Sequence, residues 1–206
     1  MIIFENISKN YSGQGLFNRV SFKINRKERV GLIGNNGNGK TTLFRLIIKE
    51  EIPDAGKITI PRNYRIGHVK QEVIITEKTV LLEAALGLRE KDPKYFWKAE
   101  KILFGLGFSS QDMQTDPANL SGGFQVRLNL AKVLVSEPDM LLLDEPNNYL
   151  DITSIRWLSR FLSAWPGELI LITHDRSFMD KVVTHTMGIH RKKTSKLSGN
   201  TEKFYL

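Results

Sequence analysis

The stretch Arg29-Val30-Gly31-Leu32-Ile33-Gly34-Asn35-Asn36-Gly37-Asn38-Gly39-Lys40-Thr41 decides the fold of this chain. Its first part is a nearly continuous apolar run, which is typical of a buried central strand. The part from Gly34 to Thr41 matches the pattern G-x-x-x-x-G-K-[ST] at every specified position. Apolar residues then recur over residues 40–49 as in a helix. The segment therefore predicts a strand, a glycine-rich loop and a helix, in that order.

A loop of this kind can bind phosphate groups. Glycines let successive backbone N–H groups converge on phosphate oxygens, and the N-terminus of the following helix adds a partial positive charge. Lys40 can reach the outer phosphates, and the Thr41 hydroxyl can bind Mg²⁺. The alternative is a turn that only joins a strand to a helix, but its position favours binding of ATP and Mg²⁺. The expected nucleotide-binding residues of this segment are Gly34, Asn35, Asn36, Gly37, Asn38, Gly39, Lys40, Thr41 and Thr42.

A second apolar run, residues 140–143, ends in two adjacent carboxylates, Asp144 and Glu145. A rigid strand could carry Asp144 to a bound Mg²⁺, and Glu145 could polarise an attacking water molecule. Two solvated acids at a strand end are the alternative interpretation. The phosphate loop earlier in the same chain favours the functional one.

Three more residues are candidates on weaker grounds. Gln71 follows a predicted strand, residues 65–69, and its amide could bind Mg²⁺ or water. His174 ends another predicted strand, residues 169–173, where it could donate a hydrogen bond to the γ-phosphate. Tyr11 could stack on adenine. Taken alone, a glutamine is usually a surface residue, a histidine at a strand end is more often structural, and Tyr11 fits a core position equally well.

Composition limits the class of protein. The 206 residues are 41% hydrophobic and contain no cysteine, and no apolar run is long enough to span a membrane. Met1 leads directly into a strand pattern without a signal peptide, which fits a cytoplasmic protein. The net charge of +8 would attract RNA or an acidic surface, although it could also serve solubility alone. The basic residues are scattered, apart from a small cluster at residues 191–193.

The order of patterns predicts one domain over residues 1–206. Short strands come first, a helical region follows over residues 76–135, and strands alternating with helices return after it. This order predicts an α/β core formed by about 1–75 and 136–206, with residues 76–135 as a helical subdomain.

The segment Leu120-Ser121-Gly122-Gly123-Phe124-Gln125 resembles the signature motif of ABC ATPases, and the order of all the motifs is similar to that family. The resemblance implies an ABC-type P-loop NTPase core with a small antiparallel β-subdomain and a helical signature subdomain. It also implies that two cassettes bind head to tail around two ATP molecules, with Asp151 at their interface. The implied catalytic residues are Glu145, His174 and Gln71. The implied Mg²⁺ ligands are Thr41, Gln71 and Asp144. The residues implied to contact the partner's nucleotide are Ser121, Gly122, Gly123 and Gln125.

The segment Pro146-Asn147-Asn148-Tyr149-Leu150-Asp151 is similar to the Asn-rich stretch of ABC-F proteins, as are residues 174–179 and Gly199-Asn200 near Tyr205. That branch implies a soluble protein of two tandem cassettes that acts on ribosomes, in translation control or antibiotic resistance. Two features differ from it. This chain contains one cassette, which suggests an N-terminal cassette that stands alone. Only 48 residues separate Gln71 from Leu120, too few for a long helical hairpin.

Two other functions remain open at this point. The chain could be the ATPase subunit of a membrane ABC transporter, because the core chemistry would be the same. It could also be an interaction module that binds ATP and scarcely hydrolyses it, because a lone cassette has no partner signature. In either case we expect no direct insertion into a membrane.

Overall fold

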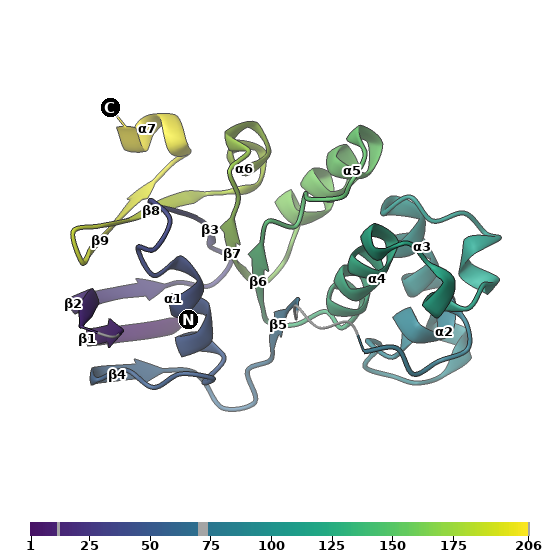
Figure 1. Cartoon of the computed structure of the whole chain (residues 1–206), viewed down its shortest axis with the longest axis horizontal. Helices are drawn as coiled ribbons and strands as arrows, with labels where there is room; N and C mark the ends of the chain where they lie inside the picture. Colours follow the sequence, from purple (N-terminus) through teal and green to yellow (C-terminus); the bar gives the residue numbers. More distant parts are fainter. Residues whose placement is uncertain (12, 70–73, 206) are drawn as a thin grey trace. The chain divides into compact units, whose positions relative to one another are not determined.

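The computed structural model describes residues 1–11, 13–69 and 74–205 and divides into two compact units (Figure 1). Unit 1 comprises Met1–Ile66, Met140–Glu145 and Trp165–Leu206, and unit 2 comprises Gly67–Asp139 and Pro146–Ala164. The mixed α/β class predicted from the sequence is confirmed. The predicted helical region, residues 76–135, lies within unit 2, which also takes in residues on both sides of it and residues 146–164.

The larger sheet has the strand order β5-β6-β7-β3-β8-β9. Its strands are β3 (Arg29–Ile33), β5 (Ile66–His68), β6 (Met140–Asp144), β7 (Glu168–Ile172), β8 (His185–His190) and β9 (Lys193–Ser198). Strands β6, β7, β3 and β8 are mutually parallel, and β9 is antiparallel to β8. All five residues of β7 are buried, as are the first four of β6. Parallel pairing brings the carboxyl ends of β3, β6 and β7 to one edge of the sheet.

A smaller antiparallel sheet has the order β2-β1-β4, with β1 at Ile2–Tyr11, β2 at Gln14–Ile24 and β4 at Ala55–Thr59. Side chains alternate along β2, since Val20 and Ile24 are buried while Ser21 and Lys23 are exposed. Helix α1 (Lys40–Ile47) buries Leu43, Phe44, Leu46 and Ile47 in a core that includes side chains of both sheets. The start of α1, and hence the end of the glycine loop, is held by this core.

Unit 2 is helical. Its helices are α2 (Val80–Ala85), α3 (Phe96–Gly105), α4 (Gly122–Val135) and α5 (Ile152–Ser163), with short 3₁₀ turns at Pro93–Tyr95, Asp112–Gln114 and Pro117–Asn119. Gly105 makes close packing of α3 and α5 possible, since a Cβ atom there would lie 1.9 Å from the ring of Trp157. No helix within the described ranges combines the length and the apolar character that a membrane span requires.

Several elements differ from the sequence-based expectation. The helical region expected over residues 76–135 is divided into several helices, the first of which, α2, ends at Ala85. A Cβ atom at Gly87 would lie 2.1 Å from the carbonyl oxygen of Lys132. Only glycine therefore lets the chain pack this closely against α4. Three elements at the end of the chain were not predicted: α6 (Arg176–Val182), β9 and α7 (Thr201–Tyr205). Strand β9 is mostly exposed and polar, so its sequence has no apolar pattern of its own.

A buried ion pair anchors the N-terminal part of unit 2. The Glu83 side chain is 1% exposed and pairs with Lys132 of α4. It also accepts hydrogen bonds from the N–H groups of Thr76 (2.9 Å) and Glu77 (2.8 Å). Burial raises the pKa of Glu83, whereas the hydrogen bonds from Lys132 and from these N–H groups lower it. The hydrogen bonds have the larger combined effect, so the pKa lies below the usual value of 4.5. The Glu83 carboxylate therefore links residues 76 and 77 to both α2 and α4.

Replacing Glu83 by Gln should lower the free energy of unfolding by about 1–3 kcal/mol at neutral pH, because Lys132 loses its charged partner. A lowered folded-state pKa means that the carboxylate stabilises the fold above its unfolded-state pKa and loses this effect as the pH falls through the folded value. The difference between parent and variant should shrink when the pH drops below 4.5. Urea unfolding across a pH series measures it. Glu50→Gln, at an exposed residue, is the control. A difference that stays constant with pH would contradict this role.

Candidate functional site

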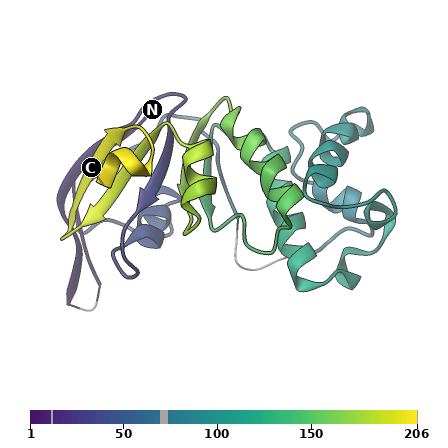
Figure 2. The same cartoon turned by 90° about the horizontal axis from the view of Figure 1, so that it is seen from above.

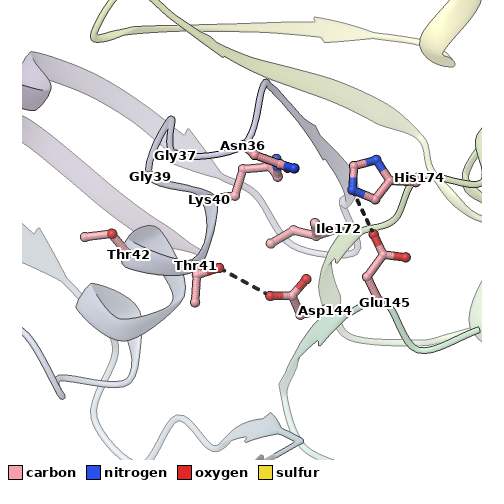
Figure 3. Close-up of a pocket in the computed structure, with 10 residues that line it drawn as sticks. All are labelled: Asn36, Gly37, Gly39, Lys40, Thr41, Thr42, Asp144, Glu145, Ile172 and His174. Atoms are coloured by element: carbon pink, nitrogen blue, oxygen red, sulfur yellow. Dashed lines mark hydrogen bonds and ion pairs between the residues drawn. The ribbon is translucent and has the colours of Figure 1, made fainter. Parts of the chain in front are cut away.

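Unit 1 contains a pocket of about 260 Å³ at the carboxyl edge of its parallel strands (Figure 3). Ten residues line it, contributed by the glycine loop, by α1 and by the ends of β6 and β7. They are Asn36, Gly37, Gly39, Lys40, Thr41, Thr42, Asp144, Glu145, Ile172 and His174. The structure thus brings the phosphate loop, the two carboxylates and the histidine into one place, although they are far apart in the sequence.

The glycine loop exposes its backbone to the pocket. Gly34, Gly37 and Gly39 have φ angles of 156°, 80° and 93°, and the latter two lie in the left-handed region that favours glycine. Gly37 has open space where a side chain would be. Gly39 caps α1 without any side-chain hydrogen bond, so the first N–H groups of the helix remain available to an anion. The loop is shaped to present N–H donors.

Lys40 lies across the same loop. Its Nζ donates to the carbonyl oxygens of Gly34 (2.6 Å) and Asn35 (3.3 Å). Asn38 turns the other way and donates from Nδ2 to the carbonyl oxygen of Ile189 in β8 (3.1 Å). Gly34, Asn35 and Asn38 therefore shape the loop without being among the ten lining residues.

Thr41 and Asp144 form a pair of oxygen ligands. The Thr41 hydroxyl donates to Oδ2 of Asp144 over 3.4 Å (Figure 3). Burial raises the pKa of Asp144, and the Thr41 hydrogen bond together with the charges of Lys40 and His174 offsets this only in part. A hydroxyl and a carboxylate are hard donors of the kind that Mg²⁺ prefers, and phosphates and water commonly complete its shell. These two residues fit the ion that the sequence predicted.

Glu145 and His174 face each other, with Oε1 and Nε2 3.7 Å apart (Figure 3). Glu145 has a φ of 48°, an uncommon value for a residue with a side chain. Its N–H donates to the carbonyl oxygen of Ile172 (2.8 Å), and its Oε2 accepts from the Thr173 hydroxyl (3.2 Å). The end of β7 and Thr173 after it therefore hold Glu145 in the pocket wall, while the His174 side chain is 76% exposed.

The structure does not place two further predicted residues, Tyr11 and Gln71, in this pocket. Tyr11, at the end of β1, is 41% exposed and does not line the pocket. Its hydroxyl donates to Glu51, and Lys9 Nζ lies 5.6 Å from the centre of its ring. Gln71 lies outside the described residues.

The residues predicted to contact a partner's nucleotide lie in unit 2, at the start of α4. Ser121 is the N-cap of this helix, and its side chain makes no capping hydrogen bond. A Cβ atom at Gly122 would meet nothing within 4 Å. Gln125 instead turns back toward the preceding loop, with Nε2 3.5 Å from the carbonyl oxygen of Pro117. The open residues Ser121 and Gly122 thus form a second helix N-terminus with free backbone donors.

Sequence reasoning missed Arg127, which joins this helix to the loop that contains Asp151. Its Nε donates to the carbonyl oxygen of Tyr149 (2.8 Å), and its Nη1 donates to that of Leu106 (3.1 Å) and to Asp151 Oδ2 (3.3 Å). The guanidinium also lies 4.6 Å from the centre of the Phe124 ring. Asp151 in turn caps α5 through the N–H of Ser154. The only signal in the sequence was an arginine one helical turn after Gly123.

Comparison with known proteins gives consistent results. Residues 17–148 match the family model described as ABC transporter. The chain is 35% identical over 99% of its length to the probable ATP-binding protein YheS of Haemophilus influenzae, of which it covers 37%. It is 31% identical over 91% of its length to ABC transporter F family member 5 of Arabidopsis thaliana, of which it covers 34%. The chain therefore spans about a third of the length of these relatives.

Solved structures share the fold. The structure titled "Structure of ATP binding subunit of ABC transporter" has a TM-score of 0.82 at 20% identity and covers 100% of this chain and 98% of its own. The dimeric post-hydrolysis structure of the ATP-binding cassette MJ0796 bound to ADP and phosphate has a TM-score of 0.79 at 21% identity, covering 96% of this chain and 98% of its own. The fold class expected from the motifs is confirmed by these neighbours.

Replacing Asp144 by Asn should raise the melting temperature of the nucleotide-free chain. The folded state raises the pKa of Asp144, so it holds the proton more tightly than the unfolded chain does, and the ionised carboxylate opposes folding at neutral pH. The same change should remove most of the additional stabilisation by MgATP. Thermal scans with and without MgATP measure both effects, and Glu5→Gln on exposed β1 is the control. If MgATP stabilised the Asp144→Asn variant as much as the parent, the metal assignment would be contradicted.

Replacing Arg127 by Gln should release the loop over residues 147–151. Hydrogen bonds to a charged group contribute about 1.5–3 kcal/mol each, so amide exchange in this loop should accelerate by about tenfold or more. Hydrogen–deuterium exchange measured by mass spectrometry tests this. Arg156→Gln, at an exposed position of α5, is the matched control. Unchanged exchange in the Arg127 variant would show that other contacts hold the loop.

Proposed function

The chain belongs to the ABC family of ATP-binding proteins and is of the ABC-F type, and we propose that it binds MgATP and hydrolyses it when paired head to tail with a second cassette. The observation that carries the proposal is the pocket of unit 1. It gathers phosphate-binding backbone, a hydroxyl–carboxylate pair and a second carboxylate beside a histidine.

In this proposal the loop and the start of α1 bind the β- and γ-phosphates through backbone N–H groups, as helix N-termini do for anions generally. Lys40 exchanges its hydrogen bonds to Gly34 and Asn35 for bonds to phosphate oxygens. Thr41 and Asp144 hold Mg²⁺, which neutralises phosphate charge when it is bound. Gln71 is proposed as a further ligand on the basis of family resemblance.

Glu145 is the proposed general base. One of its carboxylate oxygens accepts from Thr173, and the other, Oε1, is buried and makes no hydrogen bond to the described residues. A carboxylate in the pocket wall can accept a proton from the attacking water. His174, on the exposed side, is placed to donate to the γ-phosphate or to the product.

A second cassette supplies what this pocket lacks. The uncapped N-terminus of α4, with Ser121 and Gly122, is proposed to contact the γ-phosphate bound by the partner, and Asp151 to lie at the interface. The dimeric cassette with ADP and phosphate among the structural neighbours supports such a pairing. The second cassette is either another copy of this chain or a tandem cassette of a longer protein.

We further propose that the assembled protein acts on ribosomes, in translation control or antibiotic resistance, and is therefore cytoplasmic. The ABC-F relatives and the net charge of +8 support this proposal. The ATPase subunit of a membrane transporter is the competing assignment, and co-purification with a membrane permease would favour it.

Replacing Glu145 by Gln should lower ATP turnover by about 10²–10⁴-fold, the usual contribution of a general base, and leave ATP binding intact. In the parent, turnover per chain should rise with protein concentration as cassettes pair. In the variant, the ATP-bound state should persist, so the full-length protein should sediment with ribosomes only when ATP is present. Glu50→Gln is the control. Unchanged turnover would refute the base, and ribosome binding indifferent to ATP would refute the ribosomal role.

A further inference from the structure

The net positive charge of this protein is confined to one of its two units. Unit 1 contains 19 Lys and Arg residues against 11 Asp and Glu, whereas unit 2 contains 11 of each. The whole excess of +8 therefore belongs to unit 1. A single phosphate-binding pocket does not account for so many cations, since of the ten residues that line it only Lys40 is a lysine or arginine.

The turn between β8 and β9 is built from two of these cations. His190 pairs with Lys193, so Arg191 and Lys192 form a two-residue hairpin loop. Their φ angles are 48° and 65°, as a type I′ turn requires. This turn favours Asn-Gly, because residues other than glycine and asparagine fit positive φ poorly. Two exposed basic residues therefore occupy positions where folding alone would select others.

Strand β2 runs beside β9 and carries two more cations. The N–H of Asn18 donates to the carbonyl oxygen of Lys192 (3.0 Å), and Lys196 Nζ donates to that of Lys23 (2.7 Å). Strands β2 and β9 thus lie side by side, as both views show (Figures 1 and 2). We define the basic rim as the exposed residues Arg19, Lys23, Arg191, Lys192 and Lys193.

The basic rim is not neutralised by the protein itself. None of its five side chains takes part in an ion pair within residues 1–11, 13–69 and 74–205. Glu28, the acidic residue tied to β9, is buried and already paired with Lys196 at 2.6 Å. Five cations therefore remain open to an external anion.

We propose that the basic rim binds the phosphate backbone of RNA. This inference deepens the proposed ribosomal function and rests on it for the source of the RNA. Nucleic acid presents one negative charge about every 3.4 Å along each strand, and a rigid row of cations can match several of them. Membrane-surface proteins usually add an amphipathic helix, whereas the basic rim lies on strands and a hairpin turn.

The strands that carry the basic rim also contact the phosphate loop, through residues close to the rim. Ile189, two residues before the turn, accepts a hydrogen bond from Asn38. Phe17, two residues before Arg19, lies against Gly39, where a Cβ atom would be 3.1 Å from its ring. None of the five residues lines the pocket, so RNA and nucleotide occupy different sites on shared strands.

The double variant R191N/K192G tests the proposal without weakening the fold. It removes two charges and installs the residues that a type I′ turn favours, so its melting temperature should equal or exceed that of the parent. Binding of a fluorescent 20-nucleotide single-stranded RNA is measured by anisotropy on the 206-residue chain with saturating MgATP, which fills the phosphate loop. The double variant K101Q/R156Q, which removes two exposed charges from unit 2, is the matched control.

Each phosphate contact releases about 0.7 counterions from single-stranded RNA, so losing two should weaken binding about 25-fold at 0.1 M salt. The slope of log affinity against log salt should become shallower by about 1.4. Equal affinities of parent and R191N/K192G, or an equal loss in K101Q/R156Q, would overturn the proposal. So would a variant that loses binding to phosphatidylserine vesicles but not to RNA. If these oligonucleotide results hold while ribosome sedimentation fails, the ribosomal role is wrong and the RNA-binding surface stands.

Discussion

The structure depends on one constraint, which is that backbone N–H groups between β3 and α1 must stay uncovered. Gly37 and Gly39 adopt left-handed φ angles, and no side chain caps the helix that follows. Such a loop has little stability of its own, because glycine loses much conformational freedom on folding. It is held by what surrounds it: the buried strand β3 before it, the apolar face of α1 after it, and the carbonyl oxygen of Ile189 at its side.

Unit 2 repeats the same physical device with different support. The start of α4 also offers uncovered N–H groups beside small residues, and Arg127 ties its neighbouring loop to the helix. The guanidinium joins α4, the end of α3 and the loop that leads into α5. The two features proposed to face a partner cassette, Ser121 and Asp151, therefore belong to one connected structure within unit 2.

Much of the pocket could be predicted from the sequence because its residues stand at the ends of strongly apolar strands or in a glycine pattern. Asp144, Glu145 and His174 follow strands whose carboxyl ends meet at one edge of a parallel sheet, and the structure brings them together. Contacts between distant segments could not be predicted in this way. Arg127 acts through main-chain oxygens, and β9 becomes a strand by pairing with β8 and not through an apolar pattern. Stacking of Tyr11 on adenine stays a prediction, and no pattern in the sequence signalled the hydrogen bond from its hydroxyl to Glu51.

The central claim is that this pocket and the start of α4 of a second cassette are two halves of one ATP site, with a second copy of this chain as the test partner. The absence of cysteine from the sequence permits a direct test by disulfide crosslinking. Asn36→Cys lines the pocket of one chain, and Ser121→Cys begins α4 of another. The two variants are mixed under mild oxidation, with Glu145 also replaced by Gln in both. We expect a disulfide between the cysteine introduced in one chain and the cysteine introduced in the other, only when MgATP is present. ATP-bound chains that form no such mixed crosslink, or that crosslink equally well without nucleotide, would contradict the claim.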